Sequence, residues 1–275
     1  MKNLDTKTIE SFGDEWTQFD QSDLSNKEAY EIFKNYFSIF PLSKLSKTSE
    51  GFDMGCGSGR WAKFIAPKVG LLHCIDPSKS IKIAKKKLRK FDNIKYHQKS
   101  LDSSGLKKES QDFGYSLGVL HHVPKTESAI VSCVKLLKPG APFLLYIYYS
   151  FDNRPIWFKY LWNLSNFIRF FISKLPKFLK FLICDVIALI VYYPFARFVL
   201  LSEKFDLMFK NFPLHFYRSK SFYSMRTDAR DRFGTPLEKR FSKKEIHKMM
   251  QISGLEKIMF RKNAPFWTAI GYKKK

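Results

Sequence analysis

Three glycines at alternate positions are the residues of this sequence whose spacing most directly predicts a ligand site. Gly55, Gly57 and Gly59 follow an apolar stretch and precede a helical pattern. Glycine lets the chain turn tightly and lets a ligand approach bare backbone, while the N–H groups at a helix start favour negative charge. A dinucleotide loop of the form G-x-G-x-x-G would need glycine at position 60, where the sequence has Arg60. The tighter spacing, with Asp53 just before it, therefore indicates a different ligand.

A second acidic residue, Asp76, follows the next apolar stretch in the segment LLHCIDP. A carboxylate at the carboxyl end of a neighbouring parallel strand can accept hydrogen bonds from both hydroxyls of a ribose, in the crevice where such sheets bind ligands. The alternative is an aspartate that caps the helix beginning near Ser78. The glycine loop beside it favours the ribose interpretation.

Strands that alternate with helices are predicted around these residues. The expected strands are 50–54, 70–75, 93–97, 112–117 and 141–149, and the expected helices between them are 60–67, 79–91 and 127–137. This alternation implies parallel pairing through crossovers, and hence a doubly wound α/β sheet. Near the end of the chain, Ser242 and Glu245 form a capping-box pattern, Gly254 ends that helix, and 255–261 with 266–272 read as a hairpin.

The predicted organisation is a single domain over residues 1–275 with four parts. These are a helical segment at 1–48, a core at 49–150, a helical insertion at 151–235, and a C-terminal helix and hairpin at 236–275 that complete the sheet. The insertion is rich in aromatic residues, and between Arg154 and Lys220 it has eleven basic and three acidic residues. One interpretation is a cap over an apolar substrate, with lysines outward on a lipid surface. The other is a helical subdomain whose aromatic residues form its own core.

Composition limits the class of protein. The chain has 275 residues, 48 basic against 25 acidic, and a net charge of +23, which makes a nucleic acid, an acidic membrane surface or a phosphorylated metabolite a plausible partner. Its hydrophobic content of 45% excludes a disordered chain.

The four cysteines show no metal or redox spacing, so no metal is expected and a cytoplasmic location is predicted. No secretory signal is expected at the N-terminus. The most apolar tract, 181–193, is interrupted by Asp185 and is shorter than the roughly 18 residues of a membrane crossing.

Four motifs in order resemble those of the class I S-adenosylmethionine-dependent methyltransferases, particularly the bacterial type that includes the ubiquinone and menaquinone biosynthesis enzymes. The first is DMGCGSG from Asp53 and the second is IDPS around Asp76. The third is DFGYSLGVLHHVP from Asp112, and the fourth is LLKPG, which ends at Gly140. The resemblance covers about residues 45–150 and, more loosely, 241–272. It implies a Rossmann-like methyltransferase sheet, mostly parallel with an antiparallel C-terminal hairpin, and a helical insertion after the fifth strand.

The resemblance also assigns roles in binding S-adenosylmethionine. Asp53 and the backbone of the glycine loop would contact the methionine end, Asp76 the ribose, and Pro77 the adenine pocket. The backbone from Ser116 to Gly118 would approach the sulfonium. Where the family has a Gly-Asp-Ala-like turn, this sequence has Lys-Ser-Leu, so Ser100 or Asp102 would bind the adenine amino group. The implied cofactor residues are Asp53, Gly55, Cys56, Gly57, Gly59, Asp76, Pro77, Ser100, Leu101, Ser116 and Gly118.

Substrate and catalytic residues are predicted less directly. His121 is the proposed substrate-facing base after the fourth strand, and the alternative is that one of the two histidines there is packed and fixes the loop. Trp16 is predicted either in a lid over the cofactor or as a core aromatic. Four residues at the end of the insertion could recognise an anionic or sugar-like group, or belong to a solvated face: Tyr217, Arg218, Arg226 and Asp228.

The predicted function is therefore methyl transfer from S-adenosylmethionine to a small-molecule or lipid-like acceptor, by a cytoplasmic protein that can contact the inner face of an anionic membrane. The alternatives are an NAD-type oxidoreductase on a related fold and a non-catalytic protein that binds the cofactor or docks to membranes. An RNA methyltransferase is less favoured. DNA is not expected as a substrate, because the Asn/Asp-Pro-Pro-Tyr and Pro-Cys signatures of base methylation are missing from the sequence.

Overall fold

The computed structural model describes residues 3–18, 24–205 and 212–275. The chain divides into two compact units. The first comprises residues 1–21, 29–150 and 237–275, and the second comprises 22–28 and 151–236. The second unit thus contains the segment predicted as a helical insertion, together with a short piece near the N-terminus.

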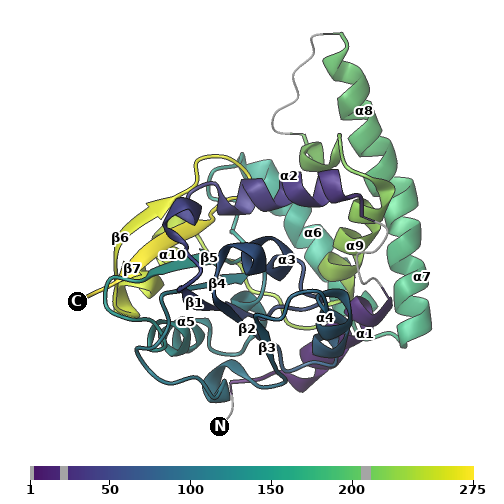
Figure 1. The fold of residues 1–275 in the computed structure, drawn as a ribbon. Helices are drawn as coiled ribbons and strands as arrows, with labels where there is room; N and C mark the ends of the chain where they lie inside the picture. Colours follow the sequence, from purple (N-terminus) through teal and green to yellow (C-terminus); the bar gives the residue numbers. More distant parts are fainter. Residues whose placement is uncertain (1–2, 19–23, 206–211) are drawn as a thin grey trace. The chain divides into compact units, whose positions relative to one another are not determined.

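The first unit is built on a seven-stranded sheet in the order β3-β2-β1-β4-β5-β7-β6. The strands are β1 Glu50–Met54, β2 Leu71–Ile75, β3 Ile94–His97, β4 Phe113–Leu117, β5 Pro142–Tyr146, β6 Leu255–Phe260 and β7 Ala269–Lys273. The first five pair in parallel, whereas β7 pairs antiparallel with both β5 and β6. Strands β6 and β7, in yellow, form one edge of the sheet (Figure 1). This confirms the predicted Rossmann-like fold. The strand order reverses at β1 and β4, and such sheets bind ligands at that switch point.

Helices cover the sheet, and those predicted over 60–67, 79–91 and 127–137 are present but shorter. They are α1 Thr6–Gln18, α2 Asn26–Phe37, α3 Ala62–Ile65, α4 Ser80–Lys87, α5 Thr126–Val134 and α10 Lys243–Ile252. The capping box of Ser242 and Glu245 is present at the start of α10. Strand β5 ends at Tyr146, earlier than predicted, and the chain beyond it keeps only an isolated bridge between Tyr149 and Phe241.

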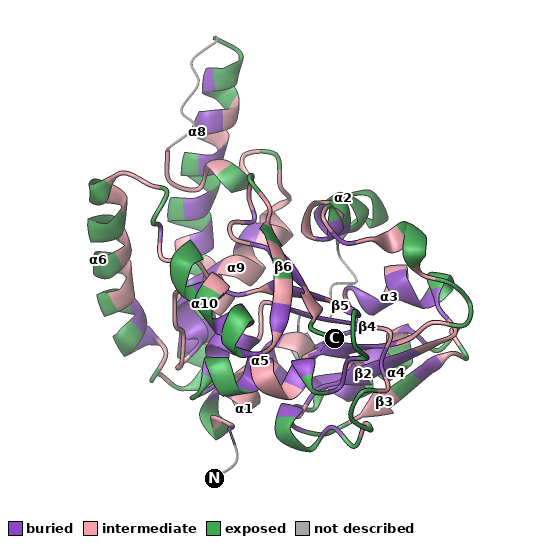
Figure 2. Ribbon diagram, turned by 90° about the vertical axis from the view of Figure 1, so that its left-hand side faces the viewer, coloured by how far each residue is buried: buried purple, intermediate pink, exposed green. Residues whose placement is uncertain are grey.

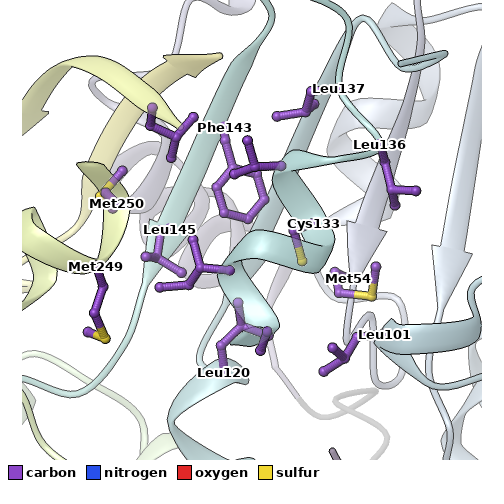
Figure 3. Packing of buried hydrophobic residues seen from close by; sticks show 14 of the residues in the cluster. Met54, Leu101, Leu120, Cys133, Leu136, Leu137, Phe143, Leu145, Met249 and Met250 are labelled. Atoms are coloured by element: carbon purple, nitrogen blue, oxygen red, sulfur yellow. The ribbon is translucent and has the colours of Figure 1, made fainter. Parts of the chain in front are cut away.

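The core of the first unit forms where α5 and α10 pack on the sheet. Buried side chains from α5 (Cys133), β5 (Phe143, Leu145) and α10 (Met249, Met250) belong to one cluster (Figure 3). On α10 the buried residues are Ile246, Met249 and Met250, at the spacing of one helix face. The cluster therefore anchors the strands whose carboxyl ends carry the candidate site.

The second unit is helical throughout its described part. It contains α6 Ile156–Ile172, α7 Lys177–Ile187, a π-helical turn at Ala188–Tyr192, α8 Tyr193–Glu203 and α9 Phe222–Gly234. Its core consists of Ile172, Cys184, Ala188, Tyr192, Ala196, Met225, Ala229 and Phe233. The interpretation that the aromatic residues form this core is wrong for most of them. Trp157, Tyr160, Phe167, Phe170, Phe171 and Phe178 are exposed, and Figure 2 shows exposed positions in green along α6 and α8.

A charge cluster joins α7 to α9 in the second unit. Asp185 accepts hydrogen bonds from both Arg226 and Arg230 of α9, with nitrogen–oxygen distances of 3.0 and 2.6 Å in the two ion pairs. The Arg230 side chain is only 2% exposed. A buried guanidinium that loses its counter-ion is costly, so Asp185 should matter to stability.

We expect Asp185→Asn to lower the free energy of unfolding by about 3 kcal/mol, the low end of the cost of breaking a buried pair, because Asp185 itself is partly exposed. Glu203→Gln is the matched control. It breaks the more exposed pair with Arg218, and we expect it to cost less than about 1 kcal/mol. Urea unfolding followed by tryptophan fluorescence measures both values, and equal effects would show that the Asp185 cluster has no special weight.

Candidate functional site

The loop after β1 adopts the backbone that its glycines predict. Gly55, Gly57 and Gly59 have φ angles of +80°, +53° and +80°. A Cβ atom on Gly55 would lie 2.5 Å from the Val119 side chain, and one on Gly59 would lie 2.6 Å from Leu88. The N–H groups of Gly55 and Cys56 both donate to the Ile75 carbonyl at the end of β2, at 2.7 and 3.1 Å. Packing and backbone conformation therefore both require this loop to be glycine-rich.

Asp76 binds the glycine loop directly. Its Oδ2 atom accepts a hydrogen bond of 2.9 Å from the Gly57 N–H. Its Oδ1 atom accepts from the N–H and hydroxyl of Ser78 at 2.9 and 2.6 Å. Burial raises the pKa of Asp76 above its usual value, while these hydrogen bonds oppose the shift. Asp76 thus stabilises the turn toward Ser78, but it does not cap α4, which begins at Ser80 without a side-chain cap. Its Oδ2 atom faces the glycine loop, as the ligand interpretation requires.

Asp53 is a buried carboxylate with an unusual environment. It is 1% exposed, and none of the described residues hydrogen-bonds to either of its carboxylate oxygens. Burial raises its pKa well above the usual value, and the charge of Asp76 raises it further. The hydroxyl of Tyr115 on β4 lowers the pKa of Asp53 and so offsets part of this shift. A buried carboxylate without a donor is costly, so this position suits a ligand that brings a donor or a positive charge.

Trp16 lies against the same loop. A Cβ atom on Gly57 would be 3.4 Å from the indole nitrogen of Trp16. Helix α1, which carries Trp16, is tied to the start of α4 by the ion pair between Asp14 and Lys79, at 2.5 Å. The structure therefore brings Trp16 to the predicted cofactor loop, on an N-terminal helix; its role as a lid stays a prediction.

The two histidines after β4 differ in their surroundings. His122 is hydrogen-bonded through Nδ1 to the Leu237 carbonyl at 2.6 Å and fixes the loop, as one histidine was expected to do. His121 is fully buried, with ring centroids 3.9 Å from both His122 and Tyr148. No described residue hydrogen-bonds to either of its ring nitrogens. Burial, followed by the charges of His122 and Arg240, holds the pKa of His121 well below 6.5, so it is a weak base here.

The other predicted cofactor residues fall into two groups. Ser116 and Ser100 use their hydroxyls internally, on the Met54 carbonyl at 2.8 Å and on Ser103 at 2.8 Å. Leu101 is buried in the core cluster, and Pro77 is half-buried next to Asp76. Gly118 has a φ of +79°, and a Cβ atom there would meet no atom within 4 Å. The backbone at Gly118 is therefore open to an approaching ligand.

The alternative adenine contact, Asp102, is engaged elsewhere. It accepts hydrogen bonds from the Asn3 N–H at 2.9 Å and from the Ser132 hydroxyl at 3.3 Å. Because the Ser100 hydroxyl is also engaged, with Ser103, the adenine contact of either residue stays a prediction.

The four predicted substrate residues all lie in the second unit and have partners there. Arg218 pairs with Glu203 at 2.5 Å, and Arg226 pairs with Asp185. Asp228 accepts a hydrogen bond of 2.9 Å from the Tyr192 hydroxyl, and the ring of Tyr217 contacts that of Tyr192. These bonds favour a structural role, and contact with a substrate stays a prediction.

Sequence reasoning missed two polar groups of the first unit. Tyr148 and Arg240 surround His121, and the Arg240 guanidinium lies 4.9 Å from the centre of the Tyr148 ring. His73 contacts Glu50 and His97, each at 2.9 Å. These residues come together only through strand pairing and a return of the chain, and they share no spacing that a motif could reveal.

Comparisons with known proteins agree with this fold. Residues 52–145 match a family model described as a methyltransferase domain. A search of curated protein sequences gave no match. Among solved structures, the chain is similar to a Bacillus halodurans C-125 protein assigned as a methyltransferase, at 14% identity over 82% of this chain and 71% of that one, with a TM-score of 0.51.

Two further structures are similar over most of the chain. One is a chain in the complex between the Haloferax volcanii Trm112 methyltransferase activator and a methyltransferase, at 11% identity over 97% of this chain and 99% of that one, with a TM-score of 0.52. The other is the CurJ carbon methyltransferase, at 12% identity over 94% of this chain and 58% of that one, with a TM-score of 0.54. The structures show the fold, and the family match supports a class I methyltransferase domain, whose cofactor is S-adenosylmethionine.

The burial of His121 predicts a pH dependence of stability. Its pKa in the folded chain lies below 6.5, so below that pH the unfolded chain binds a proton that the folded chain does not, and folding is disfavoured. We expect the free energy of unfolding to fall as the pH drops from 7.5 to 5.5, and His121→Phe, which keeps a ring in the stack, to reduce that fall. Urea titrations at several pH values test this, and an unchanged pH dependence in the variant would contradict it.

Proposed function

We propose that this chain transfers a methyl group from S-adenosylmethionine to a small-molecule or lipid-like acceptor. The observation that carries the proposal is the pairing of Asp76 with the Gly57 N–H beside the donor-free carboxylate of Asp53, at the carboxyl ends of β1 and β2. This is the end of the sheet at which doubly wound folds bind nucleotide-like ligands.

The residues present fit the cofactor at both of its ends. The ammonium of the methionine part would give Asp53 the donor and the positive charge that this buried carboxylate otherwise lacks. The two ribose hydroxyls would donate to Asp76, whose oxygens already accept hydrogen bonds in this position. Pro77 and Ser100 would border the adenine, and the open backbone of Gly118 would face the sulfonium.

The cofactor supplies an activated methyl group, so the chain has to position the acceptor and exclude water rather than provide strong acid or base chemistry. His121 is the proposed proton acceptor for a hydroxyl acceptor. Its lowered pKa makes it a weak base, which favours acceptors that lose their proton readily, such as phenols, over simple alcohols.

The proposed acceptor is apolar or lipid-like. The motifs resemble those of the ubiquinone and menaquinone biosynthesis type, and the second unit exposes large apolar side chains along α6 and α8. A cytoplasmic location in contact with the inner membrane face agrees with such an acceptor. The rival oxidoreductase interpretation lacks the third glycine of a dinucleotide loop, because Arg60 stands there.

Binding of S-adenosylhomocysteine tests the site directly. We expect Gly57→Val to abolish binding, because the side chain would block ligand approach at a positive φ. Gly140→Val is the matched control: Gly140 also has a positive φ, of +79°, with open space around it and no place in the proposed site. Calorimetric titration of both variants, with thermal unfolding to compare their strain, separates lost binding from lost stability.

The carboxylate of Asp76 is tested in the same way. We expect Asp76→Ala to weaken binding of S-adenosylhomocysteine by about 1–3 kcal/mol, through lost hydrogen bonds to the ribose. Asp92→Ala, an exposed aspartate of the same unit, should bind like the wild type. Wild-type affinity in Asp76→Ala would refute the placement of the site.

Two results would favour the rival functions. Stabilisation of the chain by NAD(H) but not by S-adenosylhomocysteine would favour the oxidoreductase. Tight binding of the cofactor without transfer of a labelled methyl group to any extract fraction would favour a non-catalytic protein.

A further inference from the structure

Exposed apolar side chains are concentrated in one part of the chain. Of the 25 large hydrophobic residues that are exposed in the described structure, 22 lie between Ile156 and Phe216. Soluble monomers rarely expose a contiguous apolar area of this extent unless it binds a partner or a membrane. The second unit therefore has a surface that water alone does not explain.

The long helix of this unit has two distinct faces. The buried face follows residues Cys184, Ala188, Tyr192, Ala196 and Val199, each at most 5% exposed. The opposite face carries Phe178, Leu182, Val186, Ile190, Tyr193 and Leu201, between 42% and 77% exposed. This second set has no charged member and runs almost the full length of the helix. We call it the apolar face of α7–α8.

The length of this helix corrects an expectation from the sequence. The apolar tract 181–193 is shorter than a membrane crossing, but α7, the π-helical turn and α8 form one helix, Lys177–Glu203, of 27 residues. By length and apolar composition this helix could span a bilayer. The tract continues past Asp185 because that residue points to the arginines of α9.

The same contacts argue against spanning. Asp185 is paired with Arg226 and Arg230, and the Tyr192 hydroxyl donates to Asp228. A helix that crossed the bilayer in this state would carry the charged helix α9 into the hydrocarbon, at a cost of several kcal/mol per uncompensated charge. A helix with one apolar face and one face fixed to a polar neighbour lies in the plane of the membrane interface instead.

Helix α6 repeats the pattern. Its exposed stripe is Ile156, Tyr160, Leu164, Phe167 and Phe171, between 55% and 73% exposed. Its opposite side is held within the unit, where Arg169 donates to the Thr235 and Pro236 carbonyls and Arg232 donates to Ser165. Both helices thus present apolar residues outward and polar anchors inward.

The charges around these faces identify the kind of membrane. Lys159, Lys174, Lys177 and Lys204 are exposed on α6 or at the ends of the helices. The ammonium of Lys174 lies 3.4 Å from the centre of the Phe170 ring, so a basic group and an aromatic group lie side by side at the end of α6. Long basic side chains beside an apolar face suit anionic lipid headgroups. A second copy of this chain would instead bring like charges together, since residues 154–220 carry eleven basic and three acidic residues.

We propose that the exposed faces of α6 and α7–α8 bind the surface of an anionic lipid bilayer, with both helices lying in the interface. This docking is separate from the proposed methyl transfer and would hold for a chain that bound no cofactor.

Sedimentation with vesicles tests the proposal on the full chain. We expect the wild type to sediment with vesicles of phosphatidylcholine and phosphatidylglycerol, and less with phosphatidylcholine alone or at high salt. The triple variant Phe178→Ser, Leu182→Ser and Ile190→Ser should lose at least about tenfold in vesicle affinity. The matched control is Ile252→Ser with Met259→Ser, which removes two similarly exposed apolar residues of the first unit and should bind as the wild type.

Two outcomes would overturn the proposal. One is wild-type protein that stays in the supernatant with every kind of vesicle. If sedimentation velocity also shows a dimer that the triple variant does not form, the apolar faces bind a second copy of the chain instead of a membrane. The other is a spanning helix, detected with the variants Lys177→Cys and Lys204→Cys on vesicle-bound protein. A membrane-impermeant maleimide should label the cysteine in both variants, and protection of one of them would show a crossing. The four native cysteines are buried, so their background is low. Binding of S-adenosylhomocysteine by the triple variant is measured separately, so failure of docking and failure of the proposed function remain distinguishable.

Discussion

Two buried carboxylates close enough to repel each other define the first unit's candidate site. Asp76 is compensated by the Gly57 N–H and by Ser78, which is possible only because the loop turns through three positive φ angles. Asp53 receives less: no described residue makes a full hydrogen bond to its oxygens, Tyr115 offsets only part of the effect of burial, and the pKa of Asp53 stays raised. The sheet thus holds a preformed position for a ligand with a positive end and hydroxyl donors, and this position lies at the carboxyl ends of the central strands, where the strand order reverses between β1 and β4.

The surroundings of His121 complement this arrangement. The ring is enclosed by His122 and Tyr148, and burial keeps it neutral at neutral pH. A site with a weak base suits a reaction in which the cofactor carries the activation and the protein mainly orders the reactants. The positive charge of Arg240, which lies over the Tyr148 ring, lowers the pKa of His121 further because it disfavours the protonated form of His121.

The sequence allowed the sheet, the glycine loop and Asp76 to be predicted, because each depends on residues that are adjacent or separated by one strand and one helix. It could not show that Asp102 is occupied by Asn3 and Ser132, or that His121 would be enclosed, since those contacts join distant parts of the chain. The sequence also could not show that most aromatic residues of the insertion are exposed. Periodicity marks a helix face but does not say whether anything covers it. Asp185 looked like an interruption of an apolar tract until its partners, 41 and 45 positions later, were seen.

The π-helical turn at Ala188–Tyr192 explains how one long helix keeps a single inward side. Lys180, Cys184, Ala188, Tyr192 and Ala196 are buried and follow one another at intervals of four. In a regular α-helix, four such intervals would rotate the last residue about 160° from the first. The wider turn accommodates an additional residue and recovers much of that rotation. Deleting one residue there would leave the helix continuous but swing α8 by about 100° about its axis, so that small side chains suited to tight packing would turn outward.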